Sequence, residues 1–210
     1  MPRQKLYWHV NNSFKLLTLA ASLQTVSVFH FMEPQITIRR CTVADATTLS
    51  HIACRTFYDT FFDTCTEEDM EGFLEQHYNT DQLESELGNP ADYYYFAEID
   101  GKPVGYLRFA ENPVPYERDN DEKALELNRL YVDEQYHGRG IAKLLMAFYE
   151  HFAARNGYKY LWLGVWEHNA RAQAFYRKFG YRFNGHKHDF PIGSTPQMDE
   201  WWDKTIPQSS

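Results

Sequence analysis

The chain has 210 residues, of which 43% are hydrophobic, 17% aromatic and 24% charged, a composition typical of a globular protein rather than a disordered or fibrous one. Its formal charge of −8 repels phosphate backbones, which argues against nucleic acid as a partner. An acidic surface favours a cationic substrate, although in most acidic proteins the charge only keeps the protein soluble. Cys41, Cys54 and Cys65 form no CxxC pair, so neither a disulfide framework nor a zinc site is indicated.

The first 33 residues differ from the rest of the chain. A basic start precedes an apolar stretch that Lys15, Ser22 and other polar residues interrupt. This stretch is too polar to span a bilayer and lacks the continuous apolar centre of a secretory signal. Met32 then begins a sequence typical of the opening of a domain. We expect residues 1–33 to be a poorly ordered extension with Met32 as the true start, and residues 34–210 to form one cytoplasmic domain that uses no membrane.

The first half of this domain mixes strands and helices. Alternating apolar and polar residues predict a strand, and capping residues followed by helical spacing predict three helices. Two further β-rich runs are joined by Asp100-Gly101, a strong hairpin signal. In chain order, the predicted elements are a strand at Gln35–Cys41, helices beginning near Thr42, Thr66 and Thr80, and strands at Tyr93–Ile99 and Val104–Phe109.

The second half follows a strand–helix–strand–helix order after a polar loop at Asn112–Lys123. Its predicted elements are a strand at Leu125–Val132, a helix at Gly140–Arg155, a strand at Tyr160–Val165, a helix at Ala170–Phe179, and final strands at Tyr181–His186 and Met198–Thr205. An antiparallel beginning followed by this alternation predicts a single α+β domain.

The most informative segment is the turn Gln135–Gly140, which connects a strand to a helix. Glycines at 138 and 140 let the backbone approach a ligand without a Cβ in the way. The unpaired N–H groups at the start of the following helix form a ready site for an anion such as phosphate. A Walker A loop is excluded because Gly-Lys-Ser/Thr is absent, and Lys143 replaces the third glycine of a dinucleotide fingerprint. Taken alone, the turn is equally compatible with a helix cap that binds nothing.

A second segment, Asn169–Tyr181, decides between these alternatives. It reads Asn-x-x-Ala-x-x-Phe-Tyr-x-x-x-Gly-Tyr, and it lies one helix and one strand after the Gln-x-x-Gly-x-Gly turn. Together the two segments resemble the GNAT superfamily of N-acetyltransferases over roughly residues 35–205. The resemblance implies a mixed, mostly antiparallel twisted sheet flanked by helices, and acetyl-CoA as cosubstrate.

The resemblance also implies roles for individual residues. Backbone groups of Leu130, Tyr131 and Val132 would pair with the pantetheine arm and hold the thioester. Asn169 would hydrogen-bond the pantetheine, and Tyr176 would lie beside the sulfur as general acid. The pyrophosphate would be received by the backbone amides of His137, Gly138, Arg139, Gly140, Ile141 and Ala142.

A base is needed because an amine is protonated at neutral pH, with a reference pKa of about 10, and only its free form attacks a thioester. Glu126 is the candidate, since it lies four positions before Leu130 and is therefore expected on the same face of the strand. Some members of the superfamily place a catalytic glutamate at the matching position. A structural or solvent-facing carboxylate is the alternative.

The acceptor amine is indicated by weaker similarities. Segments at 57–61, 68–74 and 193–199 resemble bacterial PaiA-type spermidine/spermine acetyltransferases, so a small-molecule polyamine is the expected substrate. Aromatic residues would flank its methylenes and carboxylates would hold its ammonium groups. The candidates are Tyr58, Phe61, Phe62, Asp59, Glu67, Glu68, Asp69 and Glu71. For most of them individually, a solvated helix face or an aromatic core residue is the simpler interpretation.

Other functions remain open at this point. The acceptor could be a protein or antibiotic amine, because one fold serves many substrates. The domain could also be a CoA-sensing regulator with little turnover, although the Asn169–Tyr176 pair favours chemistry. No metal is expected, and the resemblance allows a homodimer.

Overall fold

The computed structural model describes residues 35–117 and 122–206, and the extension predicted for residues 1–33 lies outside them. The described chain forms a seven-stranded sheet in the order β1-β2-β3-β4-β5-β7-β6. The strands are β1 (Ile36–Arg40), β2 (Asp92–Ile99), β3 (Lys102–Ala110), β4 (Ala124–Val132), β5 (Tyr160–Trp166), β6 (Arg182–Asp189) and β7 (Met198–Thr205). All neighbouring pairs are antiparallel except β4 and β5, which are parallel. This confirms the predicted α+β fold.

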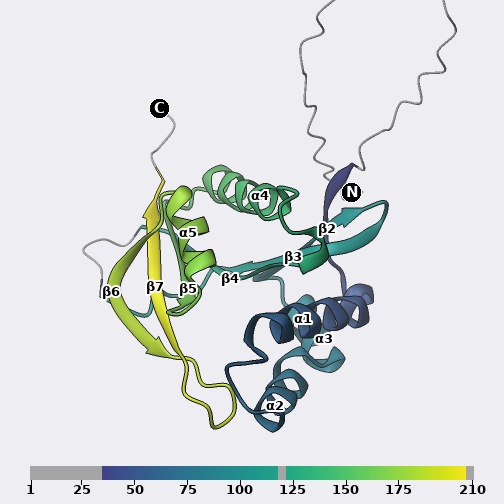
Figure 1. The fold of residues 1–210 in the computed structure, drawn as a ribbon. Helices are drawn as coiled ribbons and strands as arrows, with labels where there is room; N and C mark the ends of the chain where they lie inside the picture. Colours follow the sequence, from purple (N-terminus) through teal and green to yellow (C-terminus); the bar gives the residue numbers. More distant parts are fainter. Residues whose placement is uncertain (1–34, 118–121, 207–210) are drawn as a thin grey trace, which may run out of the picture.

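Helices cover both faces of the sheet, with α4 and α5 on one side and α1, α2 and α3 on the other (Figure 1). Their bounds are α1 (Ala46–Phe61), α2 (Glu67–Tyr78), α3 (Thr80–Gly88), α4 (Ile141–Arg155) and α5 (Ala170–Lys178), with short 3₁₀ turns at Val43–Asp45 and Glu134–Tyr136.

Local sequence signals account for several of these boundaries. Asp100 and Gly101 both adopt positive φ, 52° and 75°, as the two-residue turn between β2 and β3 requires. The Thr66 side chain accepts a hydrogen bond from the N–H of Asp69 and so caps the start of α2. Thr42 and Asp45 form the predicted capping box before α1.

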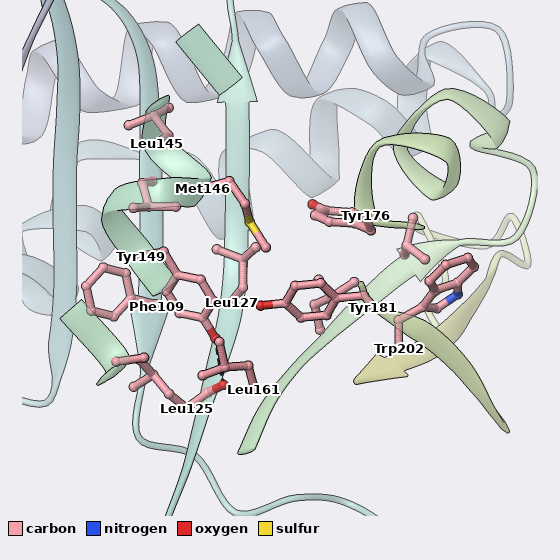
Figure 2. Close-up of a cluster of buried hydrophobic side chains, with 14 of the residues drawn as sticks. Phe109, Leu125, Leu127, Leu145, Met146, Tyr149, Leu161, Tyr176, Tyr181 and Trp202 are labelled. Carbon is pink, nitrogen blue, oxygen red and sulfur yellow. Dashed lines mark hydrogen bonds between the residues drawn. The ribbon is translucent and has the colours of Figure 1, made fainter. Parts of the chain in front are cut away.

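Two apolar cores result, one on each face of the sheet. The first lies under α4 and α5, where Leu125, Leu127 and Tyr149 are buried with Tyr181 and Trp202 (Figure 2). The second lies under α1, α2 and α3 and is rich in aromatic rings. Its buried members include Phe57, Phe61, Tyr78, Tyr94, Phe96 and Tyr106. Both helix layers are thus held to the sheet by burial of apolar surface.

The parallel pair β4 and β5 is joined along only part of its length. Its ladder runs from Ala124↔Tyr160 to Leu127↔Leu163 and goes no further. Beyond that point β5 remains paired with β7 as far as Trp166. The carboxyl ends of β4 and β5 therefore diverge in the middle of the sheet.

Within the described ranges, no helix is both long enough and apolar enough to cross a membrane.

Candidate active site

A cavity of about 460 Å³ opens where β4 and β5 diverge. Its walls come from Leu127–Tyr131 of β4 and Gly164–Trp166 of β5, together with the start of α5. Aromatic side chains of α1 and α2 and the chain between β6 and β7 close the opposite side. They include Phe57, Phe61, Phe73, Tyr78 and Phe190. The cavity thus gives access from the α1–α3 side to the unpaired edge of β4.

The edge of β4 that faces β5 beyond Leu127 makes no ladder with it. Leu130, Tyr131 and Val132 lie in this stretch, and Leu130 and Tyr131 line the cavity. Backbone N–H and C=O groups on such an edge can pair with an extended ligand as another strand would. The carbonyl of Val132 lies 2.8 Å from the Nε2 atom of His137.

The glycine turn after β4 has the geometry of an anion site. Gly138 and Gly140 have φ of 79° and 80°, a left-handed conformation that favours glycine. The first backbone hydrogen bond of α4 runs from the N–H of Leu144 to the carbonyl of Gly140, at 3.0 Å. Among the described residues, the amides of Gly138 to Lys143 have no acceptor, and no side chain caps the helix. These N–H groups and the helix dipole are therefore available to a phosphate.

The side chains of the residues in and after the glycine turn point in different directions. The ring of Tyr136 lies under the guanidinium of Arg139, 5.0 Å from its centroid. The side chain of Ile141 is buried in the core under α4, so only its backbone faces the turn. Ala142 belongs to the same first helical turn. The turn thus offers backbone amides chiefly, and Arg139 is its cationic side chain.

Asn169 and Tyr176 are brought together at the cavity by α5. The Oδ1 atom of Asn169 accepts a hydrogen bond from the N–H of Ala172, 3.0 Å away, and so caps the helix. Its amide nitrogen has no partner in the described part of the chain and can donate to a ligand. Tyr176 lies two turns further along α5 and is buried, with its ring extending toward β4 (Figure 2). Burial and the negative charge of Asp199 both raise the pKa of Tyr176, so its hydroxyl keeps its proton.

The expected relation between Glu126 and Leu130 is wrong, because β4 contains a β-bulge. Arg108 pairs with Arg129 but Phe109 pairs with Leu127, which leaves Asn128 as an extra residue. Leu130 consequently packs with Leu127 in the core under α4. Glu126 lies on the opposite face, where a bond of 2.5 Å from Asn112 holds its carboxylate. It is absent from the cavity wall, and burial raises its pKa.

Most residues predicted for acceptor binding lie outside the cavity wall. Phe61 is part of it, whereas Tyr58 and Phe62 stack on each other at the exposed end of α1. None of the five predicted carboxylates, Asp59, Glu67, Glu68, Asp69 and Glu71, is in the wall. The carboxylates found there are Asp189 and Asp199, from β6 and β7. Sequence reasoning missed them because no motif marks either residue.

Asp69 instead fastens the chain between β6 and β7 to the start of α2. Its carboxylate accepts hydrogen bonds from the N–H and hydroxyl of Ser194, at 2.8 and 2.9 Å, and from the hydroxyl of Thr195, at 2.8 Å. These bonds lower the pKa of Asp69. Because Phe190 of the same connection lines the cavity, Asp69 positions one wall of the site.

Comparisons with known proteins agree with this geometry. Residues 51–181 match the model of the Acetyltransferase (GNAT) family. An uncharacterized N-acetyltransferase of Lactobacillus delbrueckii subsp. lactis is 38% identical over 149 residues, which cover 70% of this chain and 84% of that protein. The spermine/spermidine N(1)-acetyltransferase of Bacillus subtilis is 33% identical over 106 residues, 50% of this chain and 66% of that protein.

Solved structures show the same fold. The PaiA N-acetyltransferase of Thermoplasma acidophilum, determined in complex with coenzyme A, has a TM-score of 0.65 and 22% identity, covering 81% of this chain and 99% of that one. A protein of Staphylococcus epidermidis described as a probable acetyltransferase gives a TM-score of 0.62 at 15% identity, covering 82% of this chain and 99% of that chain. At these identities the likeness concerns the arrangement of helices and strands.

Proposed function

The chain belongs to the acetyltransferase (GNAT) family and is an N-acetyltransferase with acetyl-CoA as cosubstrate, and we propose that its acceptor is a primary amine of a polyamine such as spermidine or spermine. The observation that carries the proposal is the cavity, which combines aromatic walls with two carboxylates, Asp189 and Asp199. Aromatic rings suit the methylene chains of a polyamine, and carboxylates suit its ammonium groups.

The charge of the cavity is compatible with a cation despite Arg129 in its wall. The guanidinium of Arg129 lies 3.3 Å from the carboxylate of Glu86 and 2.7 Å from the hydroxyl of Tyr94. Its positive charge is thus matched by a partner within the protein. The similarity to the Bacillus subtilis spermine/spermidine enzyme supports the same acceptor over half of this chain.

Coenzyme A would be held mainly by backbone groups. The amide of His137 already donates to the carbonyl of Glu134, at 3.0 Å, so the free amides of Gly138 to Ala142 would receive the diphosphate, supported by the dipole of α4. The pantetheine arm would pair with the open edge of β4 at Leu130–Val132 and accept a hydrogen bond from Asn169. This arrangement would place the thioester in the gap between β4 and β5, where Tyr176 lies.

Tyr176 would donate its hydroxyl proton toward the departing sulfur. With a thiol pKa of about 8.5 and a tyrosine pKa of about 10, full proton transfer in the ground state is uphill by roughly 2 kcal/mol. Burial raises the pKa of Tyr176 further. The hydroxyl therefore acts first as a hydrogen-bond donor to the developing thiolate. Transfer of its proton to sulfur comes late in the cleavage of the C–S bond. A backbone N–H of the β4 edge near Leu130 would stabilise the oxyanion of the tetrahedral intermediate.

Glu126 stays a prediction for the base. Its raised pKa suits proton acceptance, but it stands outside the cavity wall, so it would have to act through a water molecule.

The test is release of free thiol from acetyl-CoA with polyamines, peptides and aminoglycosides as acceptors. We expect spermidine or spermine to give the highest kcat/KM. Preference for a peptide or an aminoglycoside would assign the enzyme to protein or antibiotic amines. Calorimetric binding of coenzyme A without thiol release for any acceptor would indicate a regulator.

A further inference from the structure

Asp199 of β7 is a cavity carboxylate for which the described residues supply no hydrogen-bond partner. Its Oδ1 atom is shielded from solvent and has no hydrogen-bond donor among the described residues. Its other oxygen, Oδ2, lies against Gly164, where the Cβ of any larger residue would come within 3.0 Å. Leaving a carboxylate oxygen buried and unpaired costs free energy, so ionised Asp199 requires a donor from water or from a ligand.

His188 on the adjacent strand β6 is the residue opposite Asp199. Its ring stacks on Trp201, with centroids 3.9 Å apart and an angle of 4° between the planes. Its Cε1 atom also approaches Gly164, 3.5 Å from the position of a Cβ there. The Nδ1 atom of His188 is buried without a partner in the described part of the chain. Burial lowers the pKa of His188, so it is neutral at pH 7 and does not neutralise Asp199.

The other groups that face Asp199 are tyrosines. Its negative charge contributes to the raised pKa values of Tyr176 on α5 and Tyr131 on β4. Both hydroxyls keep their protons and add no charge. With His188 on β6 neutral, no cation within residues 35–117 and 122–206 compensates Asp199, and burial raises its pKa to about 7. A carboxylate with this pKa is half ionised at neutral pH.

We propose that Asp199 is the catalytic base that takes the proton from the substrate ammonium group, acting across the cavity from Tyr176. The proposal rests on the proposed acetyl transfer to a primary amine, and it names Asp199 in place of Glu126. Asp199 lies in the cavity wall, whereas Glu126 lies outside it and is held by Asn112.

The proton balance of this step is complete. One proton passes from R–NH₃⁺ to the Asp199 carboxylate, and the free amine then attacks the thioester carbon to form the C–N bond. The C–S bond breaks as the tetrahedral adduct collapses, and sulfur takes a proton from Tyr176. The nitrogen of the adduct loses a second proton, which restores Tyr176. Asp199 returns its own proton to solvent, so each turnover yields amide, free thiol and one H⁺.

The experiment compares Asp199→Asn with Glu126→Gln in thiol release across pH 6–10. We expect Asp199→Asn to lower kcat/KM by about 100-fold at pH 7, within the usual range for loss of a general base. The loss should shrink toward high pH, where more amine is already free. Affinity for coenzyme A, measured by calorimetry, should stay within twofold and will show that the variant is folded. Asp199→Ser gives a second test without the amide group.

Glu200→Gln is the matched control, because Glu200 is the next residue of β7 and contacts Lys187 and Trp202 rather than the cavity. It should keep wild-type kcat/KM. A wild-type pH profile for Asp199→Asn, or a larger pH-dependent loss for Glu126→Gln, overturns the proposal. If the wild type acetylates butylamine but not spermidine, the proposal of a polyamine acceptor is wrong. The comparison of Asp199→Asn with Glu126→Gln, made with butylamine as acceptor, then shows which residue is the base. Inactivity of the wild type with every amine overturns the proposed function and the base together.

Discussion

Leu127 on β4 and Leu163 on β5 are the last residues through which these two parallel strands pair. Immediately beyond them, Asn128 begins the bulge of β4 and Gly164 leaves room beside Asp199. The β4–β5 ladder therefore ends where β4 has its extra residue and where β5 has a glycine without a side chain. The cavity exists because all three features occur there together.

Replacing Tyr176 with Phe should separate chemistry from binding. The variant keeps the ring and its packing in the core but loses the proton donor, so we expect kcat to fall by about 100-fold. The affinity for acetyl-CoA should remain nearly unchanged, as measured by calorimetry. Turnover equal to wild type, measured by thiol release, would remove Tyr176 from the mechanism.

Gly140→Ala should weaken binding of coenzyme A. The left-handed φ of 80° at this position costs an alanine roughly 1–2 kcal/mol, and relaxing it would turn the amides of the turn away from the phosphate. We expect the Kd for coenzyme A to rise by about 10-fold, or ~1.4 kcal/mol.

Gly157→Ala supplies the control for this conformational cost. Gly157 has a φ of 77° and follows the other end of α4, and a Cβ there also meets no atom within 4 Å. This variant should lose a similar amount of thermal stability but keep its affinity for coenzyme A. Equal loss of affinity in both variants would show that the turn acts only through stability.

Asp69→Asn should affect the acceptor more than the cosubstrate. An amide has a single acceptor oxygen and no charge, so it cannot replace all the bonds that the carboxylate accepts from Ser194 and Thr195. We expect the KM for the amine to rise several-fold while the Kd for coenzyme A stays constant. Glu68→Gln, at an exposed neighbouring position of α2, should change neither quantity. A change confined to the Kd for coenzyme A would contradict this role.

Asp199 should also make stability depend on pH. Its pKa rises from an ordinary value of 3.8 to about 7 on folding. Between these values the folded protein holds a proton that the unfolded chain has lost, so the free energy of unfolding falls as pH rises from about 4 to about 7. The difference corresponds to ~4 kcal/mol at most.

The measurement for this prediction is the Tm of the ligand-free protein. Asp199→Asn should exceed the wild type in Tm at pH 8, and the gap should close at pH 4. Glu200→Gln should show no such trend. A Tm for Asp199→Asn below that of the wild type at pH 8 would mean that another group of the protein stabilises the ionised carboxylate, and would contradict this prediction.

Local signals in the sequence were sufficient for most of the fold. The Asp100-Gly101 turn and the caps at Thr42 and Thr66 act through neighbouring residues, and each was confirmed. The order of the last strands was not predictable in this way. β7 inserts between β5 and β6, and this depends on pairings between residues far apart in the chain, such as Leu163 with Trp202.

The site was predictable where it consists of a motif. Short sequence patterns were enough to predict the amides of the glycine turn and the pair Asn169 and Tyr176. In the structure the glycine turn follows the end of β4, and Asn169 and Tyr176 line the cavity. Asp189 and Asp199 have no such pattern. Their position depends on how the β6–β7 hairpin lies over β5, so they appear only once the sheet is assembled.

The single extra residue at Asn128 has an effect on everything after it in β4. It sends the Arg129 and Tyr131 side chains toward α2 and α3, and those of Leu130 and Val132 toward α4. If Asn128 instead took a regular place in the ladder, with no bulge, the two sets would be exchanged. A guanidinium would then enter the apolar layer under α4, and leucine would take its place against Glu86. One inserted amino acid thus determines which half of the molecule receives each functional group of this strand.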